Sequence, residues 1–531
     1  MESAFRIAYP ETELLFRLGD PVTTLQRTPP TETRSPESGR HRRPAASSSR
    51  IYGGGSRWLI LGVIALAQLV VVLDATIVNI ALPSAQQDLG FSDDARQWLI
   101  TAYALAFGSL LLLGGRLGDL VGRKPMFLIG LIGFASASAL GGAAGSFEVL
   151  VTARALQGVF GAMLAPAALS LLTVTFTEKD ERAKAFGVFG AISGGGGAIG
   201  LILGGALTEY LSWRWCLYVN APLALAAVVG TIVLIPSLAK SATRARIDLP
   251  GSLVIVGGLV ALVYGLGNAE SEGWTSMTTL TCITLGIALI GIFLLIERDV
   301  ANPLLPLRIL ADRTRGGAYA ALAVCGAGMF AVLLFLTFYM STIKQFSPLQ
   351  TGFAFLPMIA ALAVTATALA KVTALVGPKL SVFTGMLFAA GGLMLFTLLD
   401  FDSSYLTHVV PGLVITGIGL GLVMAPAMAA ATSGVQADDA GVASAAVSTF
   451  QQIGGSIGTA VLSALAAAAA SDYLQGRAPN PANQAMAAME SYTTTFFWGA
   501  AIFAAGAVVC GLLFPPGPVQ ADPEAEPVMA H

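Results

Sequence analysis

The stretch "WLILGVIALAQLVVVLDATIVNIAL", from Trp58 to Leu82, contains a single ionisable residue, Asp74. About 20 predominantly apolar residues make a helix long enough to cross the hydrocarbon core of a bilayer. A charged carboxylate is costly there, and such residues usually face the interior of a helix bundle and serve a function. The stretch therefore predicts a membrane-spanning helix and makes Asp74 a candidate functional residue.

The composition of the whole chain extends this prediction. Of its 531 residues, 55% are hydrophobic and only 11% are charged, and the mean hydropathy is +0.75. A soluble domain carries about 25% charged residues, so we expect an all-α integral membrane protein with many spans. The net charge of −2 provides no basic field for nucleic acid. The cysteines lie in or beside apolar runs without metal-ligand spacing, so we expect no metal site and no cofactor.

The two ends of the chain have a different composition. Residues 1–57 include "TPPTETRSPESGRHRRPAASSSR", which is rich in Pro, Ser and Arg and too polar to fold alone. They lack the apolar core of a signal peptide near Met1. We expect a disordered basic cytoplasmic arm, or an overcalled start site. Residues 516–531 are expected to form a short acidic cytoplasmic tail.

About fourteen apolar runs are long enough to span a bilayer. They lie near residues 58–82, 98–114, 126–145, 149–176, 184–208, 217–236, 250–267, 277–296, 316–341, 352–372, 380–399, 408–431, 440–470 and 494–514. All should be helical, because a backbone group in lipid must find its hydrogen-bond partner within its own segment. The loops between them leave no room for a soluble catalytic domain.

The charges of the loops predict the orientation of these spans. Lys and Arg gather in every second loop, whereas the alternate loops are poor in them, as in "GNAESEGW" at 267–274. The basic loops lie between spans two and three, four and five, six and seven, and eight and nine. The loop with Asp438 and Asp439 breaks the pattern. Basic loops stay in the cytoplasm, so both termini are expected there, in the cytoplasmic membrane.

Three pairs of matching segments indicate an internal repeat at an offset of about 255 residues. They are "LVGRKPMFLIG" (120–130) with "LVGPKLSVFTG" (375–385), "GAMLAPA" (161–167) with "GLVMAPA" (421–427), and Gly200 and Gly204 with Gly454 and Gly458. We therefore expect a six-helix bundle at 58–236, a second at 316–515, and an inserted helix pair at 237–315. Repeated bundles of this kind build one class of secondary transporters, with the substrate site near mid-membrane.

The loop "GRLGDLVGRK", from Gly115 to Lys124, has a distinctive pattern of glycines and charges. Its glycines favour a tight turn, and its carboxylate lies among three cations. A carboxylate here is able to cap a helix N-terminus or to pair with the cations in one arrangement of the two bundles and not in the other. We interpret the loop as a gating latch. Its candidate residues are Gly115, Asp119, Gly122, Arg123 and Lys124.

This loop resembles the second–third loop signature of the major facilitator superfamily, Gly-x-x-x-Asp-basic-x-Gly-basic-basic, with Leu120 in place of one basic residue. Four further segments resemble the fourteen-helix drug:proton antiporters of that superfamily. They are "LDATIVNIALP" (73–83), "RALQG" (154–158), "WRWCLYVNAPL" (213–223) and "SPLQTGFAFLP" (347–357). The resemblance runs from about Trp58 to Pro515. It implies two six-helix bundles plus two extra helices, and proton-driven export of bulky, often cationic or aromatic compounds.

The fifth span contains nine glycines in the nineteen residues "GVFGAISGGGGAIGLILGG", 187–205. Glycines spaced three or four apart share one helix face, where another backbone is able to approach and slide. The expected seam consists of Gly190, Gly194, Gly197, Gly200 and Gly204. The antiporter signature of the family has a proline where this chain has Leu201, so a kink there is not implied.

Arg154 is the second charge placed well inside an apolar run. We expect Asp74 and Arg154 to face a central cavity and to interact, directly or through water. Burial favours the neutral form of a carboxylate, whereas a neighbouring arginine favours the charged form. A carboxylate that alternates between these influences takes up and releases protons, so the pair is the candidate for proton coupling. The alternatives are a structural ion pair, or an Asp74 that hydrogen-bonds its own turn.

Polar and aromatic residues elsewhere are candidates for other contacts. Asn79 lies roughly 140° around the helix from Asp74, so we expect it to hydrogen-bond another helix. Aromatic rings suit flat or cationic compounds, although rings in spans often only pack. The candidate substrate-cavity residues are Gln157, Phe335, Phe338, Tyr339, Gln451 and Gln452.

The sequence predicts a proton-coupled exporter of drugs or antibiotics that works by alternating access and draws its energy from the proton gradient. The expected partners are a small-molecule drug or metabolite, protons and the lipid bilayer, and we expect a monomer. An exporter dedicated to an endogenous metabolite and a proton symporter remain alternatives within the same fold. A non-transporting receptor or scaffold is a more remote one. The chain lacks HExxH and a P-loop, and it has no GxSxG with the partners of a catalytic triad, so we do not expect an enzyme.

Overall fold

The computed structural model describes residues 54–517, with gaps at 94, 177, 237–247, 301–302, 369–374, 436–438 and 479. In this described part the regular secondary structure is helical throughout, and 14 segments are long and apolar enough to cross a membrane. The all-α prediction and its number of spans are confirmed. The predicted arm and tail lie outside the described residues except at their inner ends, where α1 already begins at Gly54.

The helices follow the predicted spans closely. The first part of the chain forms α1 (Gly54–Leu89), α2 (Trp98–Val121), α3 (Arg123–Gly142), α4 (Phe147–Thr175), α5 (Lys179–Tyr210), α6 (Trp215–Tyr218) and α7 (Asn220–Leu234). The middle forms α8 (Leu249–Glu272), α9 (Met277–Asp299) and the short α10 (Leu307–Ala311). The last part forms α11 (Arg313–Phe338), the π-helical turn η2 (Tyr339–Ile343), α12 (Pro348–Ala354), α13 (Leu356–Ala368), α15 (Pro378–Phe396), η3 (Tyr405–Val409), α16 (Val410–Thr432), α17 (Ala440–Leu474) and α18 (Pro481–Leu513).

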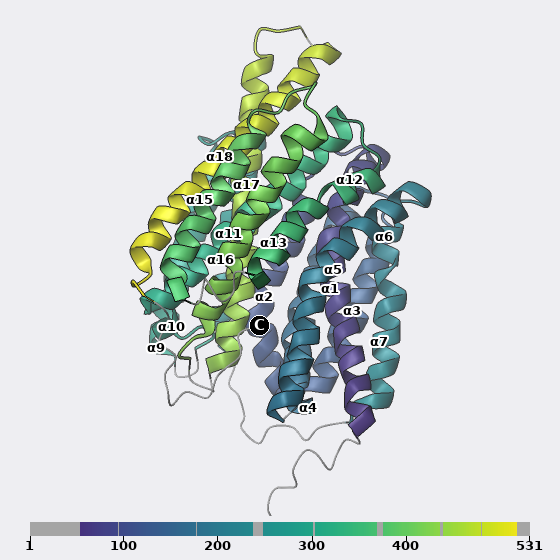
Figure 1. Cartoon of the computed structure of the whole chain (residues 1–531), viewed down its shortest axis with the longest axis vertical. Coiled ribbons are helices and arrows are strands. Elements are labelled where there is room, and N and C mark those ends of the chain that lie inside the picture. The colour runs from purple at the N-terminus through teal and green to yellow at the C-terminus, as the bar shows by residue number, and fades with distance from the viewer. Residues whose placement is uncertain are drawn as a thin grey trace, which may run out of the picture. The chain divides into compact units, whose positions relative to one another are not determined.

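Successive spans run in opposite directions, so that the loops alternate between two ends of the bundle (Figure 1). We call the end where α1 begins the Gly54 end, and the opposite end the α12 end. Helices α1–α7 lie together, and α11–α18 form a second group beside them. The groups meet where α2 packs on α17 and where α5 packs on α12.

Helices α8 and α9 pack on each other and beside the seam between α2 and α17. Leu105 of α2, Leu259 and Val263 of α8, and Ala460 of α17 form one small apolar cluster there. On the outer side of the pair, Leu253, Leu280, Ile287 and Leu295 expose 50–66% of their surface. An apolar face of this kind suits lipid chains, because lipid, unlike water, does not oppose its exposure.

The internal repeat is visible in the turns that precede α3 and α15. Gly122 and Gly377 occupy matching repeat positions, and both have a positive φ, of 104° and 87°. Pro166 and Pro426 likewise lie inside α4 and α16. The chain therefore reverses direction in the same way in each group, at a backbone conformation that favours glycine.

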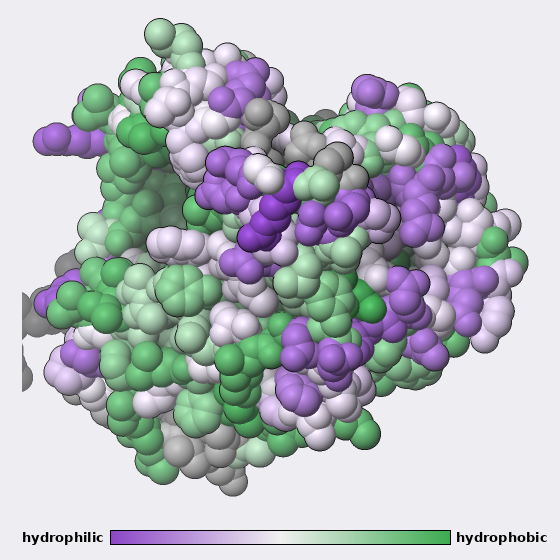
Figure 2. All heavy atoms as spheres, turned by 90° about the horizontal axis from the view of Figure 1, so that it is seen from above, coloured by the Kyte–Doolittle hydropathy of each residue, from purple (hydrophilic) through white to green (hydrophobic). Residues whose placement is uncertain are grey.

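The end face that carries α12 is polar. Hydrophilic residues gather across its middle, and hydrophobic residues dominate its left and lower flanks (Figure 2). A polar end and apolar flanks are the pattern of a bundle whose ends face water and whose sides face lipid.

Candidate functional site

Asp74 and Arg154 form an ion pair between α1 and α4. Arg154 Nη1 lies 2.6 Å from Asp74 Oδ2. Arg154 exposes 2% of its surface and Asp74 exposes 0%. The predicted interaction is therefore present and direct. Because neither charge reaches water or lipid here, each depends on the other and on neighbouring dipoles for stabilisation.

Arg154 is held in place by contacts on several sides. Its Nε donates to the backbone oxygen of Leu99 at 3.1 Å, and its Nη1 also donates to Gln157 Oε1 at 3.0 Å. Its guanidinium lies 4.4 Å from the centre of the Tyr103 ring. Gly158 makes this approach possible, because a Cβ there would lie 2.4 Å from the backbone oxygen of Tyr103. The close packing of α2 against α4 thus places the arginine.

The other oxygen of Asp74 is bound by two amides. Asp74 Oδ1 accepts from Gln157 Nε2 at 2.7 Å and from Asn220 Nδ2 at 2.8 Å. Gln157 was predicted to line a substrate cavity; the structure places it in the buried network, so any contact with substrate stays a prediction. Asn220 was not predicted. Its signals in the sequence were a polar residue at the start of an apolar run, in "VNAPL", and its place in the family-like segment 213–223.

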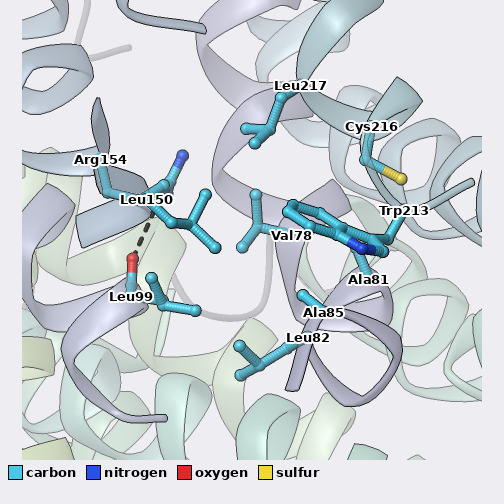
Figure 3. Close-up of a pocket in the computed structure, with 10 residues that line it drawn as sticks. All are labelled: Val78, Ala81, Leu82, Ala85, Leu99, Leu150, Arg154, Trp213, Cys216 and Leu217. Carbon is cyan, nitrogen blue, oxygen red and sulfur yellow. Dashed lines mark hydrogen bonds between the residues drawn. The ribbon is translucent and has the colours of Figure 1, made fainter. Parts of the chain in front are cut away.

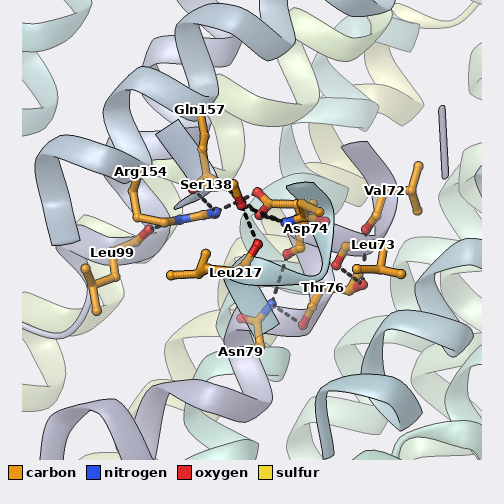
Figure 4. A network of polar contacts seen from close by, with 12 residues as sticks. Val72, Leu73, Asp74, Thr76, Asn79, Leu99, Ser138, Arg154, Gln157 and Leu217 are labelled. Carbon is orange, nitrogen blue, oxygen red and sulfur yellow. Dashed lines mark hydrogen bonds and ion pairs between the residues drawn. The ribbon is translucent and has the colours of Figure 1, made fainter. Parts of the chain in front are cut away.

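Ser138 of α3 completes the network (Figure 4). Its Oγ accepts from Gln157 Nε2 and Asn220 Nδ2, each at 3.0 Å, and donates to the backbone oxygen of Leu217 at 2.7 Å. The sequence analysis missed this residue because one serine in an apolar run indicates little. Side chains from α1, α3, α4 and α7 therefore share one continuous set of hydrogen bonds around the carboxylate.

Helix α5 packs against α1 next to Asp74. A Cβ on Gly200 would lie 2.0 Å from Thr76 Oγ1, and one on Gly204 would lie 2.8 Å from Ile77. Gly197 has a looser contact, 3.7 Å from Thr76. The predicted seam is thus used in its half near the α12 end.

The other half of the predicted seam differs. Gly190 has no atom within 4 Å of its Cβ position among the described residues. Gly194 lies within α5, but its contacts are not among those the structure describes. The helix itself continues unbroken through Leu201.

A small cavity adjoins Arg154 on the side toward the α12 end (Figure 3). Its lining consists of Val78, Ala81, Leu82, Ala85, Leu99, Leu150, Arg154, Trp213, Cys216 and Leu217. It leaves about 10 Å³ for the centre of a water molecule, which is room for about one water. We had expected the pair to face a central cavity; in this state its neighbouring space is water-sized because the helices close around it.

The interhelical hydrogen bond predicted for Asn79 is wrong. Asn79 Nδ2 donates to the backbone oxygens of Ala75 and Thr76, at 3.1 and 3.3 Å, both in its own helix. A short amide side chain reaches the carbonyls three and four residues earlier without needing a partner helix.

The predicted latch lies at the Gly54 end. Gly122 forms the turn between α2 and α3, and a Cβ on Gly115 would lie 3.7 Å from Pro166, its nearest neighbour among the described residues. Lys124 Nζ donates to the backbone oxygens of Ile232 and Ile235, so it holds the end of α7. Arg123 is the first residue of α3. Asp119 lies in the last turn of α2, but its side chain is outside the described part.

The candidate aromatic residues lie near the α12 end. Phe335, Phe338 and Tyr339 are buried, with 1%, 3% and 0% of their surface exposed. The Arg96 guanidinium, from the loop before α2, lies 4.1 Å from the centre of the Phe338 ring. In this state Phe335 and Phe338 contact Arg96 of the first group, whereas Tyr339 donates to the backbone oxygen of Asp400 in its own group. Contact of these rings with a substrate stays a prediction.

The two glutamine candidates on α17 lie where it meets other helices. Gln451 and Gln452 are half-buried. A Cβ on Gly108 of α2 would lie 3.0 Å from Gln452 Cβ, and one on Gly326 of α11 would lie 2.0 Å from the backbone oxygen of Gln451. Their contact with a substrate likewise stays a prediction.

A second contact between the groups joins α5 to α12. Glu209 Oε2 accepts from Ser347 Oγ at 2.6 Å and from the backbone N–H of Leu349 at 3.0 Å. Below it, a Cβ on Gly205 would lie 2.7 Å from Leu349 Cα, and one on Gly352 would lie 2.4 Å from the backbone oxygen of Leu201. The two backbones touch here because neither glycine carries a side chain.

The sequence and the arrangement of spans both match one family. The sequence matches the family model described as Major Facilitator Superfamily over residues 64–459. The chain belongs to the major facilitator superfamily. In this major facilitator protein, no group of three or more His, Cys, Asp and Glu residues in the described part is placed to hold a metal ion.

Its relatives are antibiotic resistance and export proteins. It is 47% identical over 460 residues to the puromycin resistance protein of Streptomyces alboniger, covering 86% of this chain and 91% of that protein. It is 36% identical to the cephamycin export protein of Amycolatopsis lactamdurans, covering 75% and 82% of the two chains. It is 33% identical to the tetracenomycin C resistance and export protein of Streptomyces glaucescens, covering 83% and 81%.

Solved structures support the fold. A bacterial homologue of the human lysosomal transporter Spinster, in an inward-facing and unoccupied conformation, matches with a TM-score of 0.63 at 16% identity, covering 87% of this chain and 98% of that one. An auto-inhibited peptide transporter of the POT family matches with a TM-score of 0.60 at 16% identity, covering 86% and 96%. The predicted major facilitator fold is confirmed, and this protein is a multi-pass membrane protein.

Proposed function

We propose that this protein exports antibiotic-like compounds in exchange for protons, and that Asp74 carries the proton. The observation that supports the proposal most is the buried ion pair of Asp74 and Arg154, at 2.6 Å. Buried pairs add little to stability compared with apolar packing, and ionisable residues within spans mark proton or substrate pathways.

The coupling follows from the contacts of the pair. When Asp74 is charged, it ties α1 to α4 and α7 through Arg154, Gln157 and Asn220. A proton on Asp74 removes the charge that holds Arg154 and weakens these ties. A substrate that favours the charged arrangement then competes with the proton, and this competition links export to proton entry.

The substrate class rests on the relatives, which resist or export puromycin, cephamycin and tetracenomycin C. We place the substrate contacts on the predicted cavity residues. Phe335 and Phe338 become available once the α12 end opens, because Arg96 now covers Phe338 at 4.1 Å. An aromatic ring released from a cation in this way suits a flat or cationic compound.

The contacts between the two groups favour a state closed at the α12 end. We assign this end to the outside and the Gly54 end to the cytoplasm, because the Gly54 end carries the basic loops. Both termini are then cytoplasmic, and the membrane is the cytoplasmic one. Outward opening requires the two bundles, 58–236 and 316–515, to rock until Glu209 leaves α12.

Transport into inside-out vesicles tests the proposal. When the vesicle lumen is more acidic than the medium, puromycin uptake should be fast with the wild-type protein and absent with Asp74→Asn. Asn79→Leu is the matched control, since the hydrogen bonds of Asn79 within the described residues go to carbonyls of its own helix. Unchanged uptake with Asp74→Asn would refute the role of Asp74 as proton carrier.

The same vesicles separate the alternatives. Protons that leave the vesicle as the drug enters indicate an antiporter, whereas protons that enter with it indicate a symporter. A panel of unrelated dyes and antibiotics separates a multidrug exporter from one dedicated to a single metabolite. Absence of flux for every compound, with the protein correctly inserted, would favour a receptor.

The latch at 115–124 is a separate part of the proposal. Asp119 is proposed to gate the cytoplasmic side together with the turn at Gly122 and the cations Arg123 and Lys124. Asp119→Asn should slow turnover while the protein still inserts and binds puromycin. A wild-type transport rate in this variant would exclude the latch.

A further inference from the structure

Asn220 has one buried polar atom that the network leaves without a partner. The residue is 0% exposed, and its Nδ2 donates to both Asp74 and Ser138. Its Oδ1 has no hydrogen-bond partner among the described residues. A buried carbonyl without a donor costs free energy, so this atom calls for an explanation.

Each polar side-chain atom of the neighbouring Asp74, Ser138 and Gln157 has at least one hydrogen-bond partner. Ser138 Oγ accepts two N–H groups and donates one hydrogen. Gln157 donates through Nε2 to Asp74 and Ser138, and its Oε1 accepts from Arg154. The donors thus converge on a charged Asp74, and among these four side chains Asn220 Oδ1 is the acceptor without a hydrogen-bond partner in the described part of the chain.

Protonation of Asp74 changes this balance. A proton on Oδ1 turns that oxygen into a donor, and it then faces N–H groups of both Gln157 and Asn220. One amide must turn away. Gln157 is fixed through its Oε1 by Arg154, which is itself anchored on Leu99. The Asn220 amide has no acceptor-side anchor within the described residues, so it is the one free to turn.

We propose that Asn220 is a positioning residue that switches with the protonation of Asp74. The proton passes from hydronium in the water to Asp74 Oδ1; one O–H bond of hydronium breaks, a water molecule is left, and the new O–H bond forms on the carboxyl group. The Asn220 amide rotates about its last side-chain bond, and its Oδ1 accepts the new O–H. The same rotation withdraws Nδ2 from Ser138, so that proton binding loosens α7 from α3. This inference rests on the proposed proton-carrying role of Asp74.

The other groups around Asp74 are consistent with one switching partner. Within the described residues, the ionisable groups that interact electrostatically with Asp74 include Arg154 of α4, Tyr103 of α2 and Cys216 of α6. Cys216 is engaged with Thr208 of α5 at 3.2 Å. On the side of α5, Gly200 lies against Leu73 and Thr76 of α1 and offers no side chain.

Infrared difference spectroscopy of the purified protein, as a function of pH, tests the proposal. Protonated Asp74 gives a carboxylic C=O band, identified by its loss in Asp74→Asn. A hydrogen bond from the acid O–H to Asn220 lowers the frequency of this band. We expect Asn220→Leu, and the smaller Asn220→Val should the first fail to fold, to move the band to higher frequency. Asn79→Leu should leave it in place.

The outcomes separate the two proposals. A wild-type band that Asp74→Asn removes, but that neither Asn220 variant moves, would overturn the switch and leave the proton-carrying role intact. A wild-type protein without any such band over the working pH range would remove both, since Asn220 would then have no proton to sense. A shifted band together with lost transport in Asn220→Leu would support both.

Discussion

Glu209, at the end of α5, accepts a 2.6 Å hydrogen bond from the hydroxyl of Ser347, which lies 138 residues later at the start of α12. This bond joins the two groups of helices at the α12 end, beside a seam in which the backbones of α5 and α12 touch. Any movement that opens this end must break both contacts. The bond is therefore a direct point at which to test the proposed transport cycle.

Glu209→Gln should shift the protein toward the state open at the α12 end. The variant loses the charge that strengthens the bonds to Ser347 and to the Leu349 N–H. Because Glu209 is solvent-exposed, the effect should be about 1 kcal/mol, or roughly a fivefold change in the ratio of the two states. Distances between spin labels on α5 and α12 measure this ratio.

Glu148 provides the control for Glu209. It is an exposed carboxylate at the same end, in the first turn of α4. Glu148→Gln should leave the distance distribution unchanged. Equal distributions for the wild type and Glu209→Gln would show that the Glu209 bonds do not keep this end closed.

Arg154→Gln should destabilise the protein strongly, because Asp74 would remain buried without its partner. Removing one member of a buried pair costs about 3–5 kcal/mol. The double variant Asp74→Asn with Arg154→Gln should recover part of this loss, since neither charge is then left alone. The free energies of unfolding of the wild type, the two single variants and the double variant, measured in detergent, together form a double-mutant cycle. Losses that simply add would mean that the pair is not coupled.

Gly200→Ala should push α5 away from α1. The new methyl group would lie 2.0 Å from Thr76 Oγ1, and overpacking of this kind costs about 1–3 kcal/mol. The temperature of thermal unfolding and the rate of puromycin transport should both be lower than in the wild type. Gly187→Ala is the matched control on the same helix, because its Cβ position has no neighbour within 4 Å among the described residues.

Gly190→Ala tests the predicted seam in the state that is not seen here. No described atom lies within 4 Å of its Cβ position, so the temperature of thermal unfolding should be unchanged. Lost transport with unchanged stability would indicate that Gly190 meets another helix after the bundles rock. Normal transport would restrict the sliding seam to the half of α5 that contacts α1.

Gly122→Ala should disrupt the turn between α2 and α3. Gly122 has a φ of 104°, a conformation that costs a residue with a Cβ about 1–3 kcal/mol. We expect a smaller amount of folded protein in the membrane, and slower transport by the molecules that do insert. Gly118→Ala is the control in the same segment, because its nearest neighbour, Met126, lies 4.0 Å from the Cβ position. Equal losses in the two variants would argue against a specific role for the turn.

The ion pair illustrates how far sequence reasoning reached into the site. Asp74 and Arg154 were predicted to meet because each is a charge within an apolar run that lipid does not tolerate. Ser138 and Asn220 were missed because an uncharged polar residue is common in such runs and does not indicate which face it occupies. The prediction for Asn79 failed for a related reason, since its own helix carbonyls were available as acceptors.

The sequence by itself determined which segments leave water, how many there are and which charges must be buried among them. These follow from composition along the chain, because hydrocarbon offers no hydrogen bonds and each span must satisfy its own backbone. Only the tertiary structure decided which helices touch and which end is closed. Contacts such as Gly205 with Leu349 depend on the shapes of two distant surfaces, and hydropathy carries no information about how such surfaces fit.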